Sequence, residues 1–286
     1  MVYLEGGGWC FSLENCIDRS KKGFGSSKYA NGTNFVGILD SNSQLNHYFY
    51  NWNKVFIHYC DGSMFMSNIK QVDPSNNLTF RGARIYNAMM EEMLRKGMGN
   101  AHNAILSGSS ADSGFFIHGE GALANITGLH FAHVIATHEL GALLPRSCTS
   151  KRDPNLCLFP EYLVEDVSTP LFLVETTFDS FQIVYSFVPR SIQWGDCSFH
   201  FAQCNSTKIG IIKEFRPIFL KTLLKLDKSS SRGMFVDSCY LHAHIVRRST
   251  WMCSPLLPIA DWYFDRSSFQ EIDNNASPQS CPISNP

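Results

Sequence analysis

Short apolar segments that end at turns of small residues place the strongest constraint on the fold of this 286-residue chain. The segments at 1–4, 54–59 and 104–106 end at Glu-Gly-Gly-Gly, Cys-Asp-Gly and Ser-Gly-Ser-Ser-Ala turns. Such short runs between small-residue turns are typical of buried strands. At 80–96, apolar residues recur every three or four positions, which predicts an amphipathic helix ended by Gly97. A helix between two strands predicts an α/β fold with a mostly parallel sheet.

The rest of the chain continues this alternation. Two strands are expected at 170–174 and 232–236, and two helices at 129–144 and 209–224. Pro217 is expected to interrupt the last helix. Three polar runs are typical of loops, at 41–46, 228–232 and 274–286, and we expect the last to be a flexible tail. None is long enough to separate two domains, so we expect a single domain over 1–286.

Ten cysteines limit the compartment in which the chain folds. Six form close pairs in the sequence: Cys10 with Cys16, Cys148 with Cys157, and Cys197 with Cys204. No pair has the spacing of a zinc ribbon or a thioredoxin-like motif, so we expect short disulfide loops in an oxidising compartment. Four others carry no assigned pairing: Cys60, Cys239, Cys253 and Cys281. Asn-x-Ser/Thr sequences agree with a secreted glycoprotein, at Asn31, Asn77, Asn125 and Asn205.

Composition excludes two classes of partner. There are 24 Lys+Arg and 25 Asp+Glu residues, so the formal net charge is −1. A surface without a broad positive field does not favour nucleic acid or an anionic membrane as the main partner. No apolar run reaches the ~20 residues needed to span a bilayer. The start of the chain lacks the regions of a signal peptide, so we expect a truncated N-terminus.

The turn after the third predicted strand nearly matches the Gly-x-Ser-x-Gly nucleophile elbow of α/β-hydrolases. It reads Gly-Ser-Ser-Ala-Asp and places Ser110 at the nucleophile position. The early Glu-Gly-Gly-Gly-Trp turn resembles the glycine-rich oxyanion loops of lipases and esterases, whose bare amides approach the carbonyl oxygen closely. The alternative for both is an ordinary turn, but their occurrence in this order favours a hydrolase.

A serine nucleophile needs a histidine base and an acid that orients it, in the chain order Ser, Asp, His for this fold. Asp179 follows the strand expected at 170–174, and His242 follows the strand expected at 232–236. Ligand sites of α/β sheets lie beyond such strand ends. The alternatives are that Asp179 caps a helix beginning near Ser180, and that His242 or His244 is a surface histidine.

Three histidines in the segment 129–144 raise the question of a metal site: His130, His133 and His138. A zincin motif requires a second histidine four residues after His138, and that position is Ala142. We therefore reject a metalloprotease and expect neither a metal nor a cofactor.

Longer motifs carry a resemblance to a known family. They are Glu-Gly-Gly-Gly-Trp-Cys at 5–10, Tyr-Cys-Asp-Gly at 59–62, Phe-Arg-Gly-Ala-Arg at 80–84, Leu-Pro-Arg-Ser-Cys at 144–148 and Ser-Arg-Gly-Met-Phe-Val-Asp-Ser-Cys-Tyr at 231–240. Over nearly its whole length the chain resembles plant pectin acetylesterases. The broader family to which these enzymes belong also includes the animal Notum carboxylesterase. The resemblance implies an α/β-hydrolase-like fold, secretion to the cell wall, and hydrolysis of acetyl esters on homogalacturonan. It also implies acetylated pectin as the partner, and we expect a monomer.

Carried over position by position, the resemblance assigns the nucleophile, acid and base to Ser110, Asp179 and His242. It assigns the oxyanion amides to Gly7, Gly8 and Ala111.

The chain departs from the family pattern after the nucleophile. Family members continue from the elbow into a helix, whereas here Ser110 and Ala111 join almost directly to a segment that the family places further on. We therefore expect a deletion near 111–112. Most C-terminal cysteines of the family are also missing, so Cys239, Cys253 or Cys281 is expected to lack a partner, and the pairing among these residues and Cys60 stays open. The second hypothesis is accordingly a catalytically impaired truncated isoform, or a non-catalytic relative that binds pectin.

Overall fold

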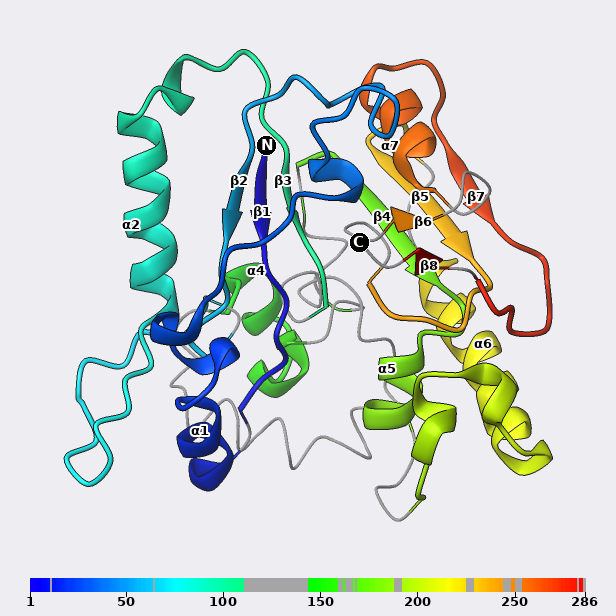
Figure 1. The fold of residues 1–286 in the computed structure, drawn as a ribbon, viewed down its shortest axis with the longest axis horizontal. Coiled ribbons are helices and arrows are strands. Elements are labelled where there is room, and N and C mark those ends of the chain that lie inside the picture. Colours follow the sequence, from blue (N-terminus) through cyan, green and yellow to red (C-terminus); the bar gives the residue numbers. More distant parts are fainter. Residues whose placement is uncertain are drawn as a thin grey trace. The chain divides into compact units, whose positions relative to one another are not determined.

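The computed structural model describes every residue except 11, 64, 111–143, 159–161, 163–166, 168, 188–191, 225–228, 244–247, 250–253, 282 and 285–286. The described residues form two compact units, whose elements are labelled in Figure 1. The first unit contains those within 1–33, 53–117 and 124–163, and the second contains those within 34–52, 118–123 and 164–286. The single domain and the deletion near 111–112 stay predictions.

The first unit is built on a parallel three-stranded sheet with the order β2-β1-β3. Its strands are β1 (Val2–Leu4), β2 (Val55–Ile57) and β3 (Leu106–Gly108). All three strands were predicted, although β3 begins two residues later than the expected segment. The reason is its register: Val2 is opposite Leu106 and Leu4 is opposite Gly108, so the sheet extends into the small residues of the turn.

Helix α2 (Gly82–Arg95) packs on this sheet, as the periodicity at 80–96 predicts. Met93 is buried in a cluster with Val2 and Ile57, and further apolar residues of α2 pack against it: Ile85, Tyr86, Met89 and Met90. Gly97 follows the helix with a φ of 112°, a conformation that side chains rarely adopt. The unit also contains α1 (Leu13–Arg19), α4 (Arg146–Thr149) and 3₁₀ turns at Gly23–Gly25, Ser27–Tyr29, Met98–Asn100 and Pro154–Leu158.

The second unit contains a second parallel sheet, with the order β4-β5-β7. Its strands are β4 (Leu171–Thr176), β5 (Arg232–Asp237) and β7 (Gln270–Ile272). The sequence predicts β4 and β5 but not the three-residue β7. A separate antiparallel pair joins β6 (Arg248–Ser249) to β8 (Ile283–Ser284). The helices are α5 (Ser180–Gln182), a π-helical turn at Ile183–Phe187, α6 (Ser206–Leu223) and α7 (Leu256–Tyr263), with 3₁₀ turns at Gly37–Leu39, Gly195–Ser198 and Phe201–Gln203.

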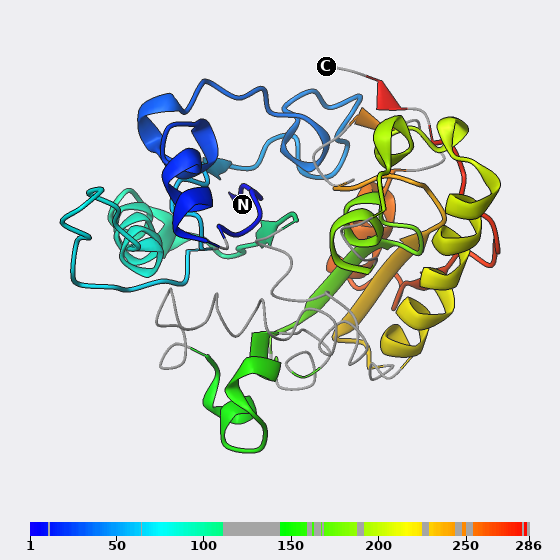
Figure 2. The same ribbon diagram turned by 90° about the horizontal axis from the view of Figure 1, so that it is seen from below.

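Helix α6, drawn in yellow in Figure 2, supplies much of the core of the second unit. One side of it is fully buried, at Ile212, Phe215, Phe219 and Leu223. The expectation that Pro217 interrupts this helix is wrong, because the helix runs unbroken from Ser206 to Leu223. Pro217 lies on the exposed side, where water can satisfy the carbonyl that its missing N–H leaves unpaired, while buried neighbours hold both halves in place.

Disulfides confirm the three close pairs, Cys10–Cys16, Cys148–Cys157 and Cys197–Cys204. Cys239 and Cys281, whose pairing the sequence leaves open, bond to each other across 42 residues. The two lie close because Gln279 pairs with Cys239 in an isolated bridge. Cys60 is a free thiol, and Cys253 lies outside the described residues.

The C-terminal segment makes several contacts, and the flexible tail expected over 274–286 stays a prediction. The Tyr240 N–H donates to the Gln279 carbonyl at 2.8 Å, and the Gln279 N–H donates to the Ser238 carbonyl at 2.8 Å. Together with the Cys239–Cys281 disulfide, these bonds tie the segment to the loop after β5. Backbone pairing is invisible in a polar sequence, so composition alone suggested a loop.

One expectation falls on residues outside this description, and another concerns membrane spans. The helix expected at 129–144, with His130, His133 and His138, lies among residues that the structure does not describe. No helix in the described part of the chain is both long and apolar enough to cross a bilayer.

The core role of α6 predicts a large loss of stability on truncation of Phe215. This side chain is 2% exposed and contacts the rings of Phe187 and Phe219, at centroid distances of 5.5 and 5.7 Å. Phe215→Ala should lower the free energy of unfolding by about 3–5 kcal/mol, measured by urea denaturation. Lys213→Ala, on the exposed side of the same helix, should change it by less than about 0.5 kcal/mol. Equal effects of the two variants would refute this packing.

Candidate active site

Ser110 lies directly after β3, in the tight turn that the sequence predicts. Its φ is 57°, a left-handed conformation that is uncommon outside glycine. Such strain is typical of a nucleophile elbow, where the serine is pushed out at the end of a strand. The preceding Ser109 is 8% exposed and shares a hydrogen bond between its hydroxyl and the Tyr3 hydroxyl of the neighbouring strand.

The glycine-rich loop after β1 lies against this turn. A Cβ atom built on Gly6 would overlap the Ser109 carbonyl oxygen and the Ser110 Cβ. A Cβ on Gly7 would overlap the ring of Tyr59. Gly8 has a φ of 68°. A side chain therefore does not fit at Gly6 or Gly7, and Gly8 has a conformation that favours glycine. The loop that contains the predicted oxyanion residues Gly7 and Gly8 packs against the Ser110 turn through Gly6, within one unit.

Hydrogen bonds hold the carbonyl groups of the glycine loop. One guanidinium nitrogen of Arg19, at the end of α1, donates to the Gly7 carbonyl at 2.6 Å and to the Gly8 carbonyl at 3.3 Å. The Tyr59 hydroxyl donates to the Gly8 carbonyl at 2.5 Å. No residue in the described ranges accepts a hydrogen bond from the Gly7 or Gly8 amide. With the carbonyls held by donors, these amides can serve a developing oxyanion.

The segment after β2, at 58–62, makes hydrogen bonds with the residues that flank the glycine loop. The Glu5 carboxylate accepts the Tyr59 N–H at 2.9 Å and contacts His58 Nδ1 at 3.0 Å. The Cys10 N–H donates to the Gly62 carbonyl at 3.0 Å, and the Cys10–Cys16 disulfide joins the loop to α1. The loop is thus fixed at both ends by groups distant in sequence.

Asp61 is a buried carboxyl group in the same supporting segment. It is 7% exposed and accepts hydrogen bonds from the Ser63 hydroxyl and, at 3.1 Å, the Phe65 N–H. Burial raises the pKa of this carboxyl, and the Ser63 and Phe65 hydrogen bonds offset part of the increase. A Cβ on Gly82 would overlap Asp61 Oδ2, the oxygen that accepts both hydrogen bonds, so α2 begins directly against this carboxyl group.

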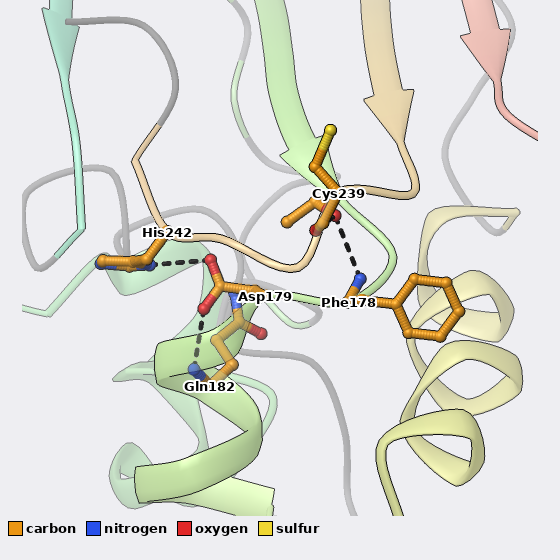
Figure 3. Close-up of polar contacts among 6 residues, drawn as sticks. Phe178, Asp179, Gln182, Cys239 and His242 are labelled. Carbon is orange, nitrogen blue, oxygen red and sulfur yellow. Dashed lines mark hydrogen bonds and ion pairs between the residues drawn. The ribbon is translucent and has the colours of Figure 1, made fainter. Parts of the chain in front are cut away.

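Asp179 and His242, the predicted acid and base, are hydrogen-bonded to each other (Figure 3). His242 Nδ1 lies 2.7 Å from Asp179 Oδ2, and the two side chains are 21% and 5% exposed. An ionised carboxylate only accepts, so Nδ1–H is the donor and Nε2 is left as the basic nitrogen. The capping alternative also holds, because Asp179 Oδ1 accepts the Gln182 N–H at 2.8 Å at the start of α5. One carboxylate performs both tasks.

The loops that carry this pair are bonded to each other. The Thr177 N–H and hydroxyl donate to the Asp237 carbonyl at 2.8 and 3.1 Å, and the Thr176 hydroxyl donates to the Cys239 carbonyl. The Phe178 N–H in turn donates to the Thr176 hydroxyl at 3.1 Å, as Figure 3 shows. These contacts extend the β4–β5 pairing beyond the strand ends, which places the acid beside the base.

A second acid lies near Asp179 at the end of β4. Burial, and then the charges of Asp179 and Asp237, raise the pKa of the Glu175 carboxyl well above its ordinary value. Burial, followed by the charge of Asp179, likewise raises the pKa of the Tyr240 hydroxyl far above its ordinary value.

The remaining predicted sites fall into two groups. The acceptor asparagines Asn31, Asn77 and Asn205 are exposed, and their glycosylation stays a prediction. Ala111 and Asn125 lie outside the described residues. Among the described residues no cluster of His, Cys, Asp and Glu side chains has the arrangement of a metal site.

Sequence reasoning missed Arg19 and Tyr59 as supports of the glycine loop. Arg19 ends an otherwise ordinary amphipathic turn, and Tyr59 reads as the last residue of a strand. No local pattern marks a side chain that bonds a backbone carbonyl 12 or 51 residues away.

Comparison with known proteins agrees with this geometry. The sequence profile of the family described as Pectinacetylesterase matches residues 1–112 and 110–282. The chain is 36% identical over 330 residues to pectin acetylesterase 11 of Arabidopsis thaliana, covering 99% of this chain and 83% of that protein. For pectin acetylesterase 7 of the same plant the identity is 36% over 318 residues, covering 96% and 80%.

Relatives in animals share a part of the sequence and the fold. Human palmitoleoyl-protein carboxylesterase NOTUM is 33% identical over 129 residues, covering 44% of this chain and 25% of that protein. The solved structure of the Wnt deacylase Notum from Drosophila matches with a TM-score of 0.77 at 23% identity, covering 98% of this chain and 90% of that one.

The parallel sheets flanked by helices, the disulfide-bearing loops and the likeness to the Notum structure define an α/β-hydrolase fold. The homologous esterases make the chain a carboxylic ester hydrolase. It belongs to the pectin acetylesterase family. The fold class and the resemblance drawn from the sequence are therefore confirmed.

The support of the glycine loop predicts a role for Arg19 in turnover. Arg19→Ala should lower kcat on p-nitrophenyl acetate by about 10²-fold with little change in KM, because the loop amides lose their alignment. Arg19→Lys keeps a positively charged donor, so its kcat should lie between those of Arg19→Ala and the wild type. Lys22→Ala removes a neighbouring cation that pairs with Asp18 at 2.7 Å, and should leave kcat unchanged. Wild-type kcat in folded Arg19→Ala would disprove the role.

The buried Asp61 predicts a pH-dependent stability. Because its pKa is raised on folding, the folded protein retains a proton that the unfolded chain releases above about pH 4. Stability contributed by Asp61 is therefore lost as the pH rises. In urea denaturation from pH 4 to 7, the free energy of unfolding of Asp61→Asn should rise relative to that of the wild type. Asp73→Asn should show the opposite trend and only below about pH 4, because hydrogen bonds from Ser75 lower the pKa of Asp73, so its contribution is lost as the pH falls. Parallel trends would contradict this assignment.

Proposed function

We propose that this chain removes acetyl groups from homogalacturonan by an acyl-enzyme mechanism with Ser110 as nucleophile, His242 as base and Asp179 as orienting acid. The observation that carries the proposal is the 2.7 Å contact between Asp179 and His242 at the ends of paired parallel strands. The strained turn at Ser110 and the glycine loop packed on it support the same mechanism.

In the first half-reaction His242 Nε2 takes the proton of the Ser110 hydroxyl while the hydroxyl oxygen attacks the acetyl carbonyl. The amides of Gly7, Gly8 and Ala111 donate to the oxyanion of the tetrahedral intermediate. The bond to the sugar oxygen then breaks, and His242 returns the proton to that oxygen. Asp179 holds the imidazole in the required tautomer throughout.

In the second half-reaction water attacks the acetyl-Ser110 ester. His242 takes the proton of the water, acetate forms, and the proton returns to Ser110. Every proton is therefore handled by one histidine, and the residues of this chain supply the whole reaction.

The proposal extends to location and assembly. We place the enzyme outside the cell, in the plant cell wall. Family membership and the four disulfides support this, because such bonds persist in oxidising compartments. We also propose that it acts as a monomer on acetylated pectin.

A fluorophosphonate probe tests the nucleophile. The purified protein should be labelled, and Ser110→Ala should abolish both the labelling and the release of acetate from acetylated pectin. Asp179→Asn should keep the fold and lower kcat by about 10⁴-fold, since the imidazole loses its tautomer. Ser147→Ala, an exposed serine of the first unit, is the matched control and should behave as wild type.

Absence of labelling in folded protein would overturn the mechanism. It would favour the impaired or non-catalytic relative as the second hypothesis. Acetate release from acetylated xylan at the same rate as from acetylated pectin would overturn the substrate assignment alone.

A further inference from the structure

Two aromatic side chains continue outward from the ring of the catalytic histidine. The Phe181 ring stacks on the His242 ring at 5.0 Å between centroids, with 25° between the planes. The Tyr185 ring lies 4.6 Å from the Phe181 ring, at 39°. Tyr185 is 55% exposed, whereas Phe181 is half-buried. We refer to Phe181 and Tyr185 as the aromatic row.

The start of α5 sets the position of this row. Asp179 caps the helix and binds His242 with the same carboxylate (Figure 3). Phe181, two residues after Asp179, therefore lies beside the imidazole. Residues four apart lie on the same side of a helix, which brings Tyr185 over Phe181. The π-helical turn at Ile183–Phe187 begins between them, and such turns occur frequently at functional sites.

An exposed tyrosine at this place is not needed for the core. The hydroxyl group allows one edge of the ring to face water while its surface stays apolar. Aromatic surfaces of this kind, beside a few polar groups, are typical of small-molecule subsites. The row therefore offers a flat apolar surface next to the nitrogen that handles the proton.

We propose that the aromatic row is a subsite for a pyranose ring of the substrate, whose apolar C–H surface stacks on Tyr185. This inference rests on the proposed function, in which His242 returns a proton to the sugar oxygen. That step requires the sugar to lie on the histidine's side of the reacting carbon, and the row begins at the imidazole itself. A near-neutral chain also has no broad positive field with which to hold a galacturonate polymer, so local stacking supplies the affinity.

The kinetic test compares two substrates of one enzyme. Tyr185→Ala should lower the ratio of kcat/KM on an acetylated oligogalacturonide to kcat/KM on p-nitrophenyl acetate by about tenfold, mainly through KM. Tyr185→Phe, which keeps the ring, should keep this ratio within about twofold. Phe199→Ala is the matched control, because Phe199 is a 71% exposed aromatic residue of the same unit. It should leave the ratio unchanged.

Three kinetic results would overturn the subsite. The first is an unchanged ratio in Tyr185→Ala. The second is an equal loss in Tyr185→Phe, which would assign the effect to the hydroxyl group. The third is an equal loss of kcat/KM on p-nitrophenyl octanoate, which would assign the row to an acyl chain.

A binding measurement separates the subsite from catalysis. Ser110→Ala protein should bind the acetylated oligogalacturonide by isothermal titration calorimetry, and adding Tyr185→Ala should raise the Kd about tenfold. If the wild type releases no acetate but this shift is found, the proposed function fails and the subsite stands. If the Kd does not change, or no binding is measured, the subsite is refuted whatever the catalytic result.

Discussion

The hydrogen bond between Asp179 and His242 is the interaction on which the proposed chemistry of this protein depends. It exists because β4 and β5 pair in parallel, with Thr176 opposite Asp237, so that both chains leave the sheet at the same edge. Hydroxyl and amide groups of Thr176 and Thr177 then continue the pairing into the loops. A shift of the register by one residue would turn each side chain to the opposite face, so the acid and the base meet only in this register.

The first unit applies the same principle to the nucleophile. Strands β1 and β3 are parallel neighbours, so the glycine loop and the Ser110 turn leave the sheet together. Close packing then requires glycine at Gly6 and Gly7, and the groups that orient the loop come from elsewhere in the chain. Arg19 and Tyr59 donate hydrogen bonds to the carbonyls of this loop. The carbonyls are therefore occupied, and the loop amides are the groups left to bind an oxyanion. In both units, strand order and not the loop sequence alone positions the reactive groups.

The parts of this arrangement that local chemistry encodes could be predicted. The strand of 54–59, the helix ended by Gly97 and the three close cysteine pairs depend on periodicity, glycine conformation and short loops. Interactions over long sequence distances could not. The Cys239–Cys281 bond and the pairing of Gln279 connect segments that carry no mutual signal, and Pro217 was misjudged because its surroundings outweigh its intrinsic preference.

The sequence by itself determined the class of fold and the family, because strand-ended turns and long motifs are local properties. It also predicts the chain order of the proposed reactive residues. Only the tertiary structure decided that Asp179 both caps α5 and binds His242, and that Phe181 and Tyr185 extend from that histidine. It also decided which donors hold the glycine loop. The physical reason is that hydrogen bonds and ring contacts depend on distances of a few ångströms, which strand pairing sets between residues far apart in the chain.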